Sequence, residues 1–323
     1  MGNLIEAVHI TKQFVAARNW LGRPKKIITA VHDVSLSIQP GETVGLVGES
    51  GCGKSTFART VLGLYSRTKG DIFYKGKTIE NLDVAQDYRR HVQMIFQDPY
   101  SSLNPRMTVE DIISEPLRNY GICRNGDERR KKVKELLELV DLRAEAAQRY
   151  PHEFSGGQRQ RVGIARALSV QPECVFCDEP ISALDVSVQV QIVNMLQKLQ
   201  KELGLAYLFI SHDLSMVHHV SHRIGVMYLG RLVELGDGND VFHHPLHPYT
   251  QLLISAIPQP DPGKKRHVEI HGEIPGPFDV PGGCVFHPRC PYASDVCCQE
   301  VPPWRHVQPN RYVACHMVKE AGL

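Results

Sequence analysis

The stretch from residue 48 to residue 55 constrains the fold of this chain most strongly. It carries three glycines followed by a lysine and a serine, and it lies between an apolar strand expected over residues 43–47 and a helix expected over residues 54–64. Glycines let the backbone turn until several N–H groups and the helix start point at one anion. The spacing matches a phosphate-binding loop, and its strand and helix context argues against a chance glycine-rich turn. We therefore expect an α/β fold that binds nucleotide phosphates.

The chemistry expected of this loop is divided between its side chains and its backbone. Lys54 is expected to neutralise the β- and γ-phosphate oxygens of ATP, and the Ser55 hydroxyl to bind Mg²⁺. The residues predicted to contact ATP here are Gly48, Glu49, Ser50, Gly51, Cys52, Gly53, Lys54, Ser55 and Thr56.

A matching acidic site is expected at the end of a second apolar strand, over residues 174–177. Asp178 and Glu179 follow that strand directly. Bound Mg²⁺ needs a further carboxylate, and an attacking water needs an acceptor for its proton. Asp178 fits the magnesium role and Glu179 the role of general base. In isolation such a pair is often a solvated turn, so the assignment depends on the loop described above.

Composition excludes some classes of protein. The chain has 323 residues and a formal net charge of +2, and its basic residues are scattered, which gives no support for nucleic-acid binding. No stretch approaches the roughly 20 apolar residues of a membrane-spanning helix, and residues 1–11 lack the layout of a signal peptide. We expect a protein of the cytosol.

Hydrophobic periodicity outlines the domain organisation. Strands are expected over residues 5–14 and 30–38, in an antiparallel layer interrupted by a polar insertion at residues 18–26. Residues 105–149 have a helical pattern, and their charge run at residues 127–134 is expected to be a solvated face.

The second half alternates between strands and helices. A helix over residues 188–203 separates the strand at 174–177 from another at 206–210, which predicts parallel strands with crossover helices. After residue 257 the sequence becomes rich in proline and glycine and ends in a cysteine-rich tail. This change places a domain boundary near residue 256.

Residues 154–158, with the sequence Phe-Ser-Gly-Gly-Gln, resemble the signature motif of ABC ATPases. Three further motifs stand in the order found in that family: Gln97 in a Q-loop, Asp185 in a D-loop and His212 as the switch histidine. Leucine is commonest where this chain has Phe154. The resemblance implies an ABC ATPase domain over residues 1–255, with a phosphate-loop NTPase core, an antiparallel β layer and a helical subdomain at about residues 100–168.

The family pattern implies roles for these residues. Ser155, Gly156, Gly157 and Gln158 would face the γ-phosphate of ATP held by a second subunit, while Asp185 keeps the two subunits in register. Glu179 and His212 would be the catalytic residues, with His212 bonded to the γ-phosphate. Gln97 would complete the magnesium shell. Phe14 matches an adenine-stacking aromatic, although a core position is the alternative.

The cysteine-rich tail resembles the C-terminal region of ATPases from oligopeptide and dipeptide importers. Cys284, Cys290, Cys297 and Cys315 are separated by five, six and seventeen residues. By the resemblance these four would hold a [4Fe–4S] cluster within a C-terminal domain over residues 256–323. Zinc, with His287 or His316, and buried thiols without metal remain alternatives. Cys174 and Cys177, before Asp178, are expected to be inert core thiols.

The resemblance implies an F-type ATPase subunit that drives import of di- or oligopeptides. Its expected partners are a paralogous ATPase subunit, two transmembrane permease subunits and an extracytoplasmic substrate-binding protein, without nucleic acid. The permeases would dock beside Gln97 and residues 100–104, at the cytoplasmic face of the inner membrane. Import of nickel or another small solute, a soluble ABC-type ATPase and a non-hydrolysing regulatory subunit are the alternatives.

Overall fold

The computed structural model describes residues 2–18, 24–257 and 273–318. Within these ranges the chain forms two compact units, and each unit combines segments that are distant in sequence. The described residues of 1–5, 38–42 and 73–210 belong to the first unit, and the described residues of 6–37, 43–72 and 211–323 belong to the second.

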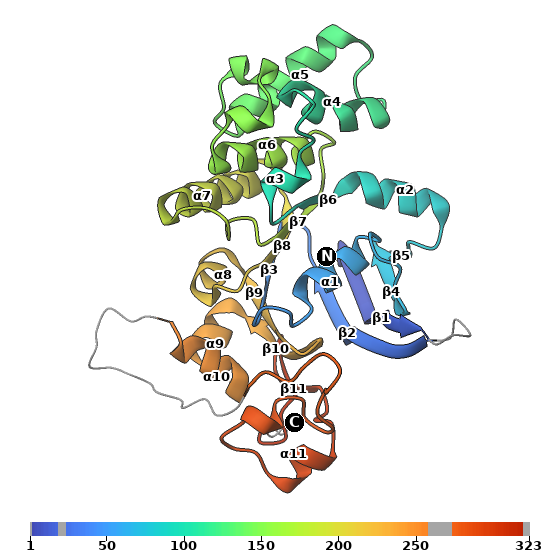
Figure 1. Ribbon diagram of the computed structural model, residues 1–323, viewed down its shortest axis with the longest axis vertical. Coiled ribbons are helices and arrows are strands. Elements are labelled where there is room, and N and C mark those ends of the chain that lie inside the picture. Colours follow the sequence, from blue (N-terminus) through green and yellow to red (C-terminus); the bar gives the residue numbers. More distant parts are fainter. Residues whose placement is uncertain (1, 19–23, 258–272, 319–323) are drawn as a thin grey trace. The chain divides into compact units, whose positions relative to one another are not determined.

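A parallel sheet forms the core of the first unit (Figure 1). In it β6 pairs with β7 and β7 with β8, both in parallel. Every residue of β7 and β8 is buried, as expected for parallel strands covered on both faces. The predicted parallel strands are therefore confirmed. The unit's elements are β5 (Lys77–Thr78), α2 (Leu82–His91), β6 (Val92–Ile95), α3 (Pro99–Ser102), α4 (Val109–Asn119), α5 (Gly126–Leu139), η1 (Ala144–Gln148), η2 (Pro151–Glu153), α6 (Gly156–Leu168), β7 (Cys174–Asp178), α7 (Val186–Leu203) and β8 (Ala206–Ile210).

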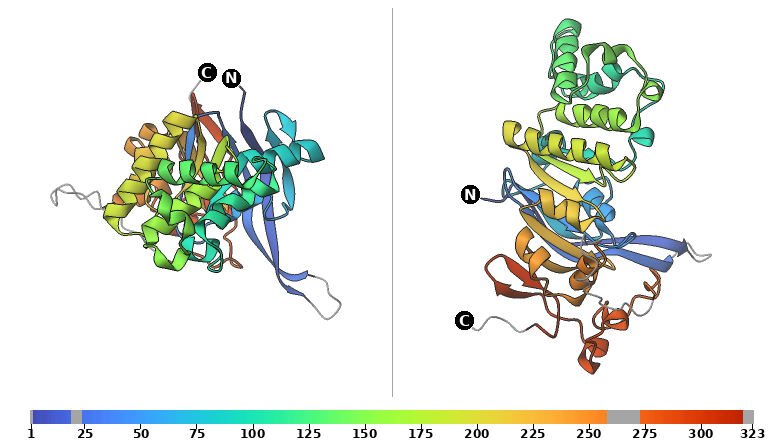
Figure 2. Two further views of the ribbon diagram at one scale, coloured as in Figure 1. Left: turned by 90° about the horizontal axis from the view of Figure 1, so that it is seen from above. Right: turned by 90° about the vertical axis from the view of Figure 1, so that its left-hand side faces the viewer.

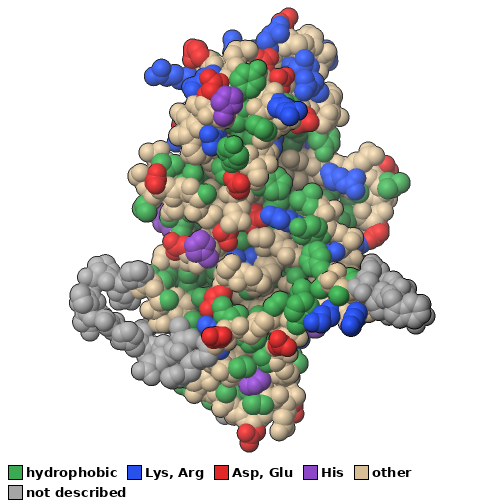
Figure 3. Space-filling model, in the orientation of Figure 1, with side chains coloured by type: hydrophobic (Ala, Val, Ile, Leu, Met, Phe, Trp, Pro, Cys, Tyr) green, Lys and Arg blue, Asp and Glu red, His purple; other side chains and the backbone are tan. Residues whose placement is uncertain are grey.

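The helices between β6 and β7 form the predicted helical part of this unit. Helix α4 packs against α5 and α6, as Figure 2 shows. Val133, Leu136 and Leu137 form the buried face of α5. Its charged residues are largely exposed, and Asp127 forms an ion pair with Arg130. The exposure of these residues confirms the predicted solvated face, and Figure 3 shows many Lys, Arg, Asp and Glu side chains on the surface of the helical part.

The second unit holds another run of neighbouring strands. Strand β3 is parallel to β9, and β9 is antiparallel to β10. The unit's elements are β1 (Ile5–Arg18), β2 (Pro24–Ile38), β3 (Thr43–Val47), α1 (Lys54–Val61), β4 (Lys69–Tyr74), α8 (Leu214–Val220), β9 (Arg223–Tyr228), β10 (Arg231–Asp237), α9 (Gly238–His243), α10 (Pro248–Ser255), η4 (His287–Arg289), α11 (Asp295–Gln299), β11 (Arg305–Gln308) and β12 (Arg311–Val313), with the ends of β1, β2 and β4 assigned to the first unit.

The β1–β2 layer differs from the prediction in its length. We expected strands to stop near Phe14 and to resume at Ala30, but β1 continues to Arg18 and β2 begins at Pro24. Only residues 19–23 of the predicted insertion lie outside the described residues. Residues 15–17 and 27–28 are apolar runs that do not alternate with polar residues, so they give no strand periodicity. Val15 and Ile27 are nonetheless 44% and 48% exposed in these strands.

The C-terminal segment continues the sheet of the second unit. Strand β12 pairs antiparallel with β10, and β11 pairs with β12. A buried ion pair between Arg311 and Glu234 joins β12 to β10, with an N–O distance of 2.6 Å and both side chains at most 2% exposed. The domain boundary near residue 256 stays a prediction, and the proline-rich residues 258–262 lie outside the described residues.

Candidate nucleotide-binding site

The glycine-rich loop joins β3 to α1 as predicted. The φ angles of Gly48, Gly51 and Gly53 are 150°, 77° and 105°, in the region that L side chains rarely adopt. A Cβ atom on Gly53 would lie 2.2 Å from the carbonyl oxygen of Ala30. Glycine is therefore required at Gly53 for both backbone conformation and space.

Lys54 begins α1 and folds back over the loop. Its Nζ donates hydrogen bonds to the carbonyl oxygens of Gly48, at 2.7 Å, and Glu49, at 3.0 Å. The lysine is 4% exposed. Phosphate oxygens could take the place of these carbonyls, so the loop fits a triphosphate. Burial raises the pKa of the neighbouring Cys52 thiol, which favours its neutral form.

Two residues from later in the sequence, Tyr249 and Arg289, form hydrogen bonds with Glu49 of this loop. The backbone N–H of Glu49 donates to the hydroxyl of Tyr249 at 2.8 Å. The Glu49 carboxylate accepts two hydrogen bonds from Arg289, at 2.8 and 3.0 Å. Neither contact could be predicted from the sequence, because each joins residues about 200 or more positions apart and no local pattern marks such pairs.

The predicted acidic site lies at the end of β7. Asp178 is fully buried, and the next residue, Glu179, has a left-handed backbone with φ 46°. Its N–H donates to the carbonyl of Ile210 at 3.0 Å. Non-glycine residues in this conformation cost about 1–3 kcal/mol and cluster at functional sites. The turn directs Glu179 out of the strand.

Gln97 lies beside Glu179. It follows β6, the neighbour of β7, and its Nε2 donates to Oε2 of Glu179 at 3.0 Å. The structure therefore brings together two of the predicted site residues. The predicted magnesium contact of Gln97 stays a prediction.

The signature motif forms the start of α6. Ser155 is the N-cap: its hydroxyl accepts from the N–H of Gln158, and the Gln158 side chain accepts from the N–H of Ser155. This capping box fixes the helix start, where Ser155 and Gly156 are exposed. Phe154, in place of leucine, is buried beneath the guanidinium of Arg149 and leaves the helix start intact.

The D-loop packs against the signature motif. A Cβ atom on Gly157 would lie 2.5 Å from Val188, and one on Gly156 would lie 3.3 Å from Leu184. Asp185 is the exposed N-cap of α7, and its carboxylate makes no capping hydrogen bond. These glycines therefore permit close packing as well as exposing backbone N–H groups.

The remaining two predicted ATP-site residues lie in the second unit. His212 is exposed just before α8. Phe14 lies on β1, where its ring meets Tyr65 edge to face and the Lys12 ammonium lies 4.7 Å from the ring centre. The roles assigned to both residues stay predictions.

The cysteines of the tail share one neighbourhood. The pKa of Cys284 is raised to about 11, mainly by burial and also by the nearby Cys297, Cys315 and Cys290 sulfurs. All nine cysteines are free thiols. Among the described residues, however, no group of three or more His, Cys, Asp or Glu side chains is placed to hold a metal ion. The donor type fits an iron–sulfur cluster, but the geometry does not support one.

The other predictions for cysteine and histidine can also be compared with the structure. His287 bonds to a backbone carbonyl through Nδ1 at 2.9 Å and His316 through Nε2 at 3.0 Å. Such bonds use one ring nitrogen and are also typical of histidines that bind a metal through the other, so recruitment of either ring by zinc stays a prediction. Cys174 and Cys177 are fully buried, as expected of core thiols.

Comparisons with known proteins identify the class. The sequence profile of the ABC transporter family matches residues 31–182, and that of the oligopeptide/dipeptide transporter C-terminal region matches residues 233–297. The oligopeptide transport ATP-binding protein AppF of Bacillus subtilis is 48% identical over 97% of this chain and 97% of its own. Its counterpart OppF of Salmonella typhimurium is 51% identical over 88% of this chain and 87% of its own.

Solved structures of ATP-binding cassettes are similar to this chain as well. A dimeric ATP-binding cassette bound to ADP and phosphate is 29% identical, with a TM-score of 0.62, and the alignment covers 72% of this chain and 98% of that one. The fold and the site therefore define an ABC ATPase. More particularly, the chain belongs to the family of ATP-binding subunits of oligopeptide/dipeptide ABC transporters. In the described ranges, no helix has the length and apolar character needed to cross a bilayer.

Proposed function

We propose that this subunit is the ATP-hydrolysing motor of an importer for di- or oligopeptides. The observation that carries the proposal is the similarity to relatives named for oligopeptide transport, which extends over nearly the whole chain. The similarity to known families includes the C-terminal region of the chain as well as the ATPase core. Import of nickel or another small solute remains the second candidate, because the cargo does not touch an ATPase subunit.

The chemistry proposed for ATP uses the residues described above. Lys54 and the N–H groups of the loop hold the β- and γ-phosphates, and Phe14 stacks on the adenine. Ser55, Gln97 and Asp178 hold Mg²⁺, which neutralises phosphate charge when it is bound. Glu179 accepts a proton from the attacking water, and His212 bonds the γ-phosphate.

A second ATPase subunit would complete each site. The exposed helix start at Ser155 offers N–H groups to the γ-phosphate held by the partner. Val186, beside Asp185, is 76% exposed, as expected of a residue that meets another subunit. A related cassette was solved as a dimer. We propose a paralogous subunit as the partner.

The membrane partners would bind the first unit at the cytoplasmic face of the inner membrane. Tyr100, on α3 next to the Q-loop, is 65% exposed and supports docking of the two permease subunits there. Peptides would reach the permeases from an extracytoplasmic binding protein. Crosslinking from Tyr100 that captured no permease would contradict this docking site.

The identity of the transported solute can be tested with the complete transporter. We expect its ATPase activity in proteoliposomes to rise several-fold when the binding protein carries short peptides, because cargo favours the closed state in which ATP is hydrolysed. Phosphate release measured with peptide and with Ni²⁺ separates the two candidates. Stimulation by Ni²⁺ and not by peptide would overturn the peptide assignment.

We further propose that Cys284, Cys290, Cys297 and Cys315 bind a [4Fe–4S] cluster, for which their side chains would have to converge further. Their four sulfur side chains, which share one neighbourhood, support it. An iron assay of anaerobically purified protein should find about four iron atoms per chain. Stoichiometric zinc, or no metal, would contradict the proposal.

A further inference from the structure

The phosphate-binding loop carries a carboxylate that is neutralised from the far end of the chain. Glu49 is paired with Arg289 through two hydrogen bonds, a bidentate arrangement that only a guanidinium can make with a carboxylate. The Arg289 side chain is 5% exposed and that of Glu49 is 23% exposed. Little solvent therefore screens the pair.

The surroundings of Arg289 hold it in this orientation. Its guanidinium lies 5.8 Å from the ring centre of Tyr228 and 6.0 Å from that of Phe286, and it also bonds the Tyr228 hydroxyl at 3.4 Å. Its Nε is buried without a hydrogen-bond partner. Burying a cation with an unsatisfied donor is costly, so the bond to Glu49 is the compensating interaction.

Because Glu49 lies in the phosphate-binding loop, its negative charge would affect the binding of ATP. Its carbonyl oxygen and that of Gly48 accept hydrogen bonds from Lys54, the cation expected to bind phosphate. An unpaired carboxylate on this loop would repel phosphate and compete for the lysine. Charges that lie close together interact more strongly where little solvent screens them, so this repulsion would weaken ATP binding. Neutralisation by Arg289 removes this penalty.

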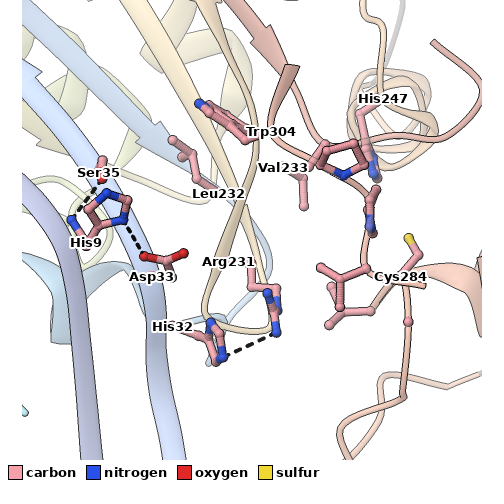
Figure 4. Close-up of a pocket in the computed structure, with 16 residues that line it drawn as sticks. His9, His32, Asp33, Ser35, Arg231, Leu232, Val233, His247, Cys284 and Trp304 are labelled. Carbon is pink, nitrogen blue, oxygen red and sulfur yellow. Dashed lines mark hydrogen bonds and ion pairs between the residues drawn. The ribbon is translucent and has the colours of Figure 1, made fainter. Parts of the chain in front are cut away.

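The segment that supplies Arg289 is not packed on every side. Cys284, five residues earlier, lines a cavity of about 340 Å³ together with Trp304 and Arg231 (Figure 4). On the opposite wall His32 accepts a hydrogen bond from Arg231. The segment from Cys284 to Cys290 thus borders open space at one end and holds the phosphate-binding loop at the other.

We propose that Arg289 is a positioning residue of the ATPase. Its ion pair keeps the Glu49 carboxylate away from Lys54 and the phosphates, so the affinity for ATP depends on the cysteine-bearing segment. This inference rests on the proposed binding of ATP at the loop. Arg289 does not touch the reacting atoms, and its loss should change KM for ATP rather than kcat.

The test is a set of variants in the complete transporter. Arg289→Met retains a long apolar side chain beside Tyr228 and Phe286, loses the 3.4 Å hydrogen bond to the Tyr228 hydroxyl and leaves Glu49 unpaired. We expect it to raise KM for ATP about tenfold, within the range typical of coupled sites, with kcat changed less than about twofold. Arg289→Lys, which retains the charge, should show a smaller rise. Adding Glu49→Gln to Arg289→Met should restore most of the lost affinity.

Two results would overturn the inference. One is an unchanged KM in folded Arg289→Met protein, and the other is a double variant no better than Arg289→Met, which would show a purely structural contact. Thermal unfolding of each variant checks the fold, and the double variant carries no unpaired charge at this site. Lys54→Ala distinguishes a failure of this inference from a failure of the proposed ATP site. If the Lys54→Ala protein binds ATP with normal affinity, the proposed binding site itself is wrong.

Discussion

Replacing Glu179 by Gln is expected to lower ATP turnover by at least about 100-fold while ATP binding is retained. The amide has the size of the carboxylate but cannot accept the proton of the attacking water. The contact with Gln97, now 3.0 Å long, can be kept because the new amide oxygen still accepts a hydrogen bond. The loss would thus reflect proton transfer rather than a collapsed site.

Phosphate release by the complete transporter, together with nucleotide binding, measures both quantities. Glu173→Gln is a matched control because Glu173 directly precedes β7 and pairs with Lys75 and Tyr74. It should leave turnover close to that of the unmodified protein. Unchanged turnover in Glu179→Gln would exclude Glu179 as the general base.

Replacing Ser155 by Arg should abolish turnover by the assembled complex but leave ATP binding by this subunit intact. Ser155 is exposed at the start of α6 and lies in the other unit from the loop that holds Lys54. A long cationic side chain would block the approach of the helix N–H groups to the partner's γ-phosphate. Defective turnover with normal binding is the pattern expected of a shared site.

The same substitution also removes a helix cap, which costs about 1 kcal/mol by itself. Asn125→Arg is the control, since Asn125 caps α5 by accepting from the N–H of Glu128. It should lose similar stability and keep turnover. Equal defects in both variants, or normal activity in Ser155→Arg, would speak against the shared site.

Sequence patterns predicted those elements whose formation depends on neighbouring residues. The predicted bounds of the strands at residues 43–47 and 206–210 agree with β3 and β8. Each depends on a short apolar run, a feature that neighbouring residues determine. The contact between Gln97 and Glu179 follows from their places at the ends of adjacent parallel strands.

Features that depend on distant segments could not be predicted. Nothing near Arg289 indicates Glu49 as its partner, and nothing in the tail shows that β12 pairs with β10. The continuation of β1 to Arg18 has no apolar alternation to reveal it. Four cysteines identify metal-binding chemistry, but spacing alone does not say whether their sulfurs converge.

The account as a whole requires that ATP be held by two subunits at once. A structure of the complete transporter carrying Glu179→Gln, with ATP and Mg²⁺, tests this directly. The account predicts that the γ-phosphate bound at Lys54 of one ATPase subunit lies within hydrogen-bonding distance of the signature serine and glycine N–H groups of the other. A closed complex in which the helix start at Ser155 faces no phosphate would contradict it.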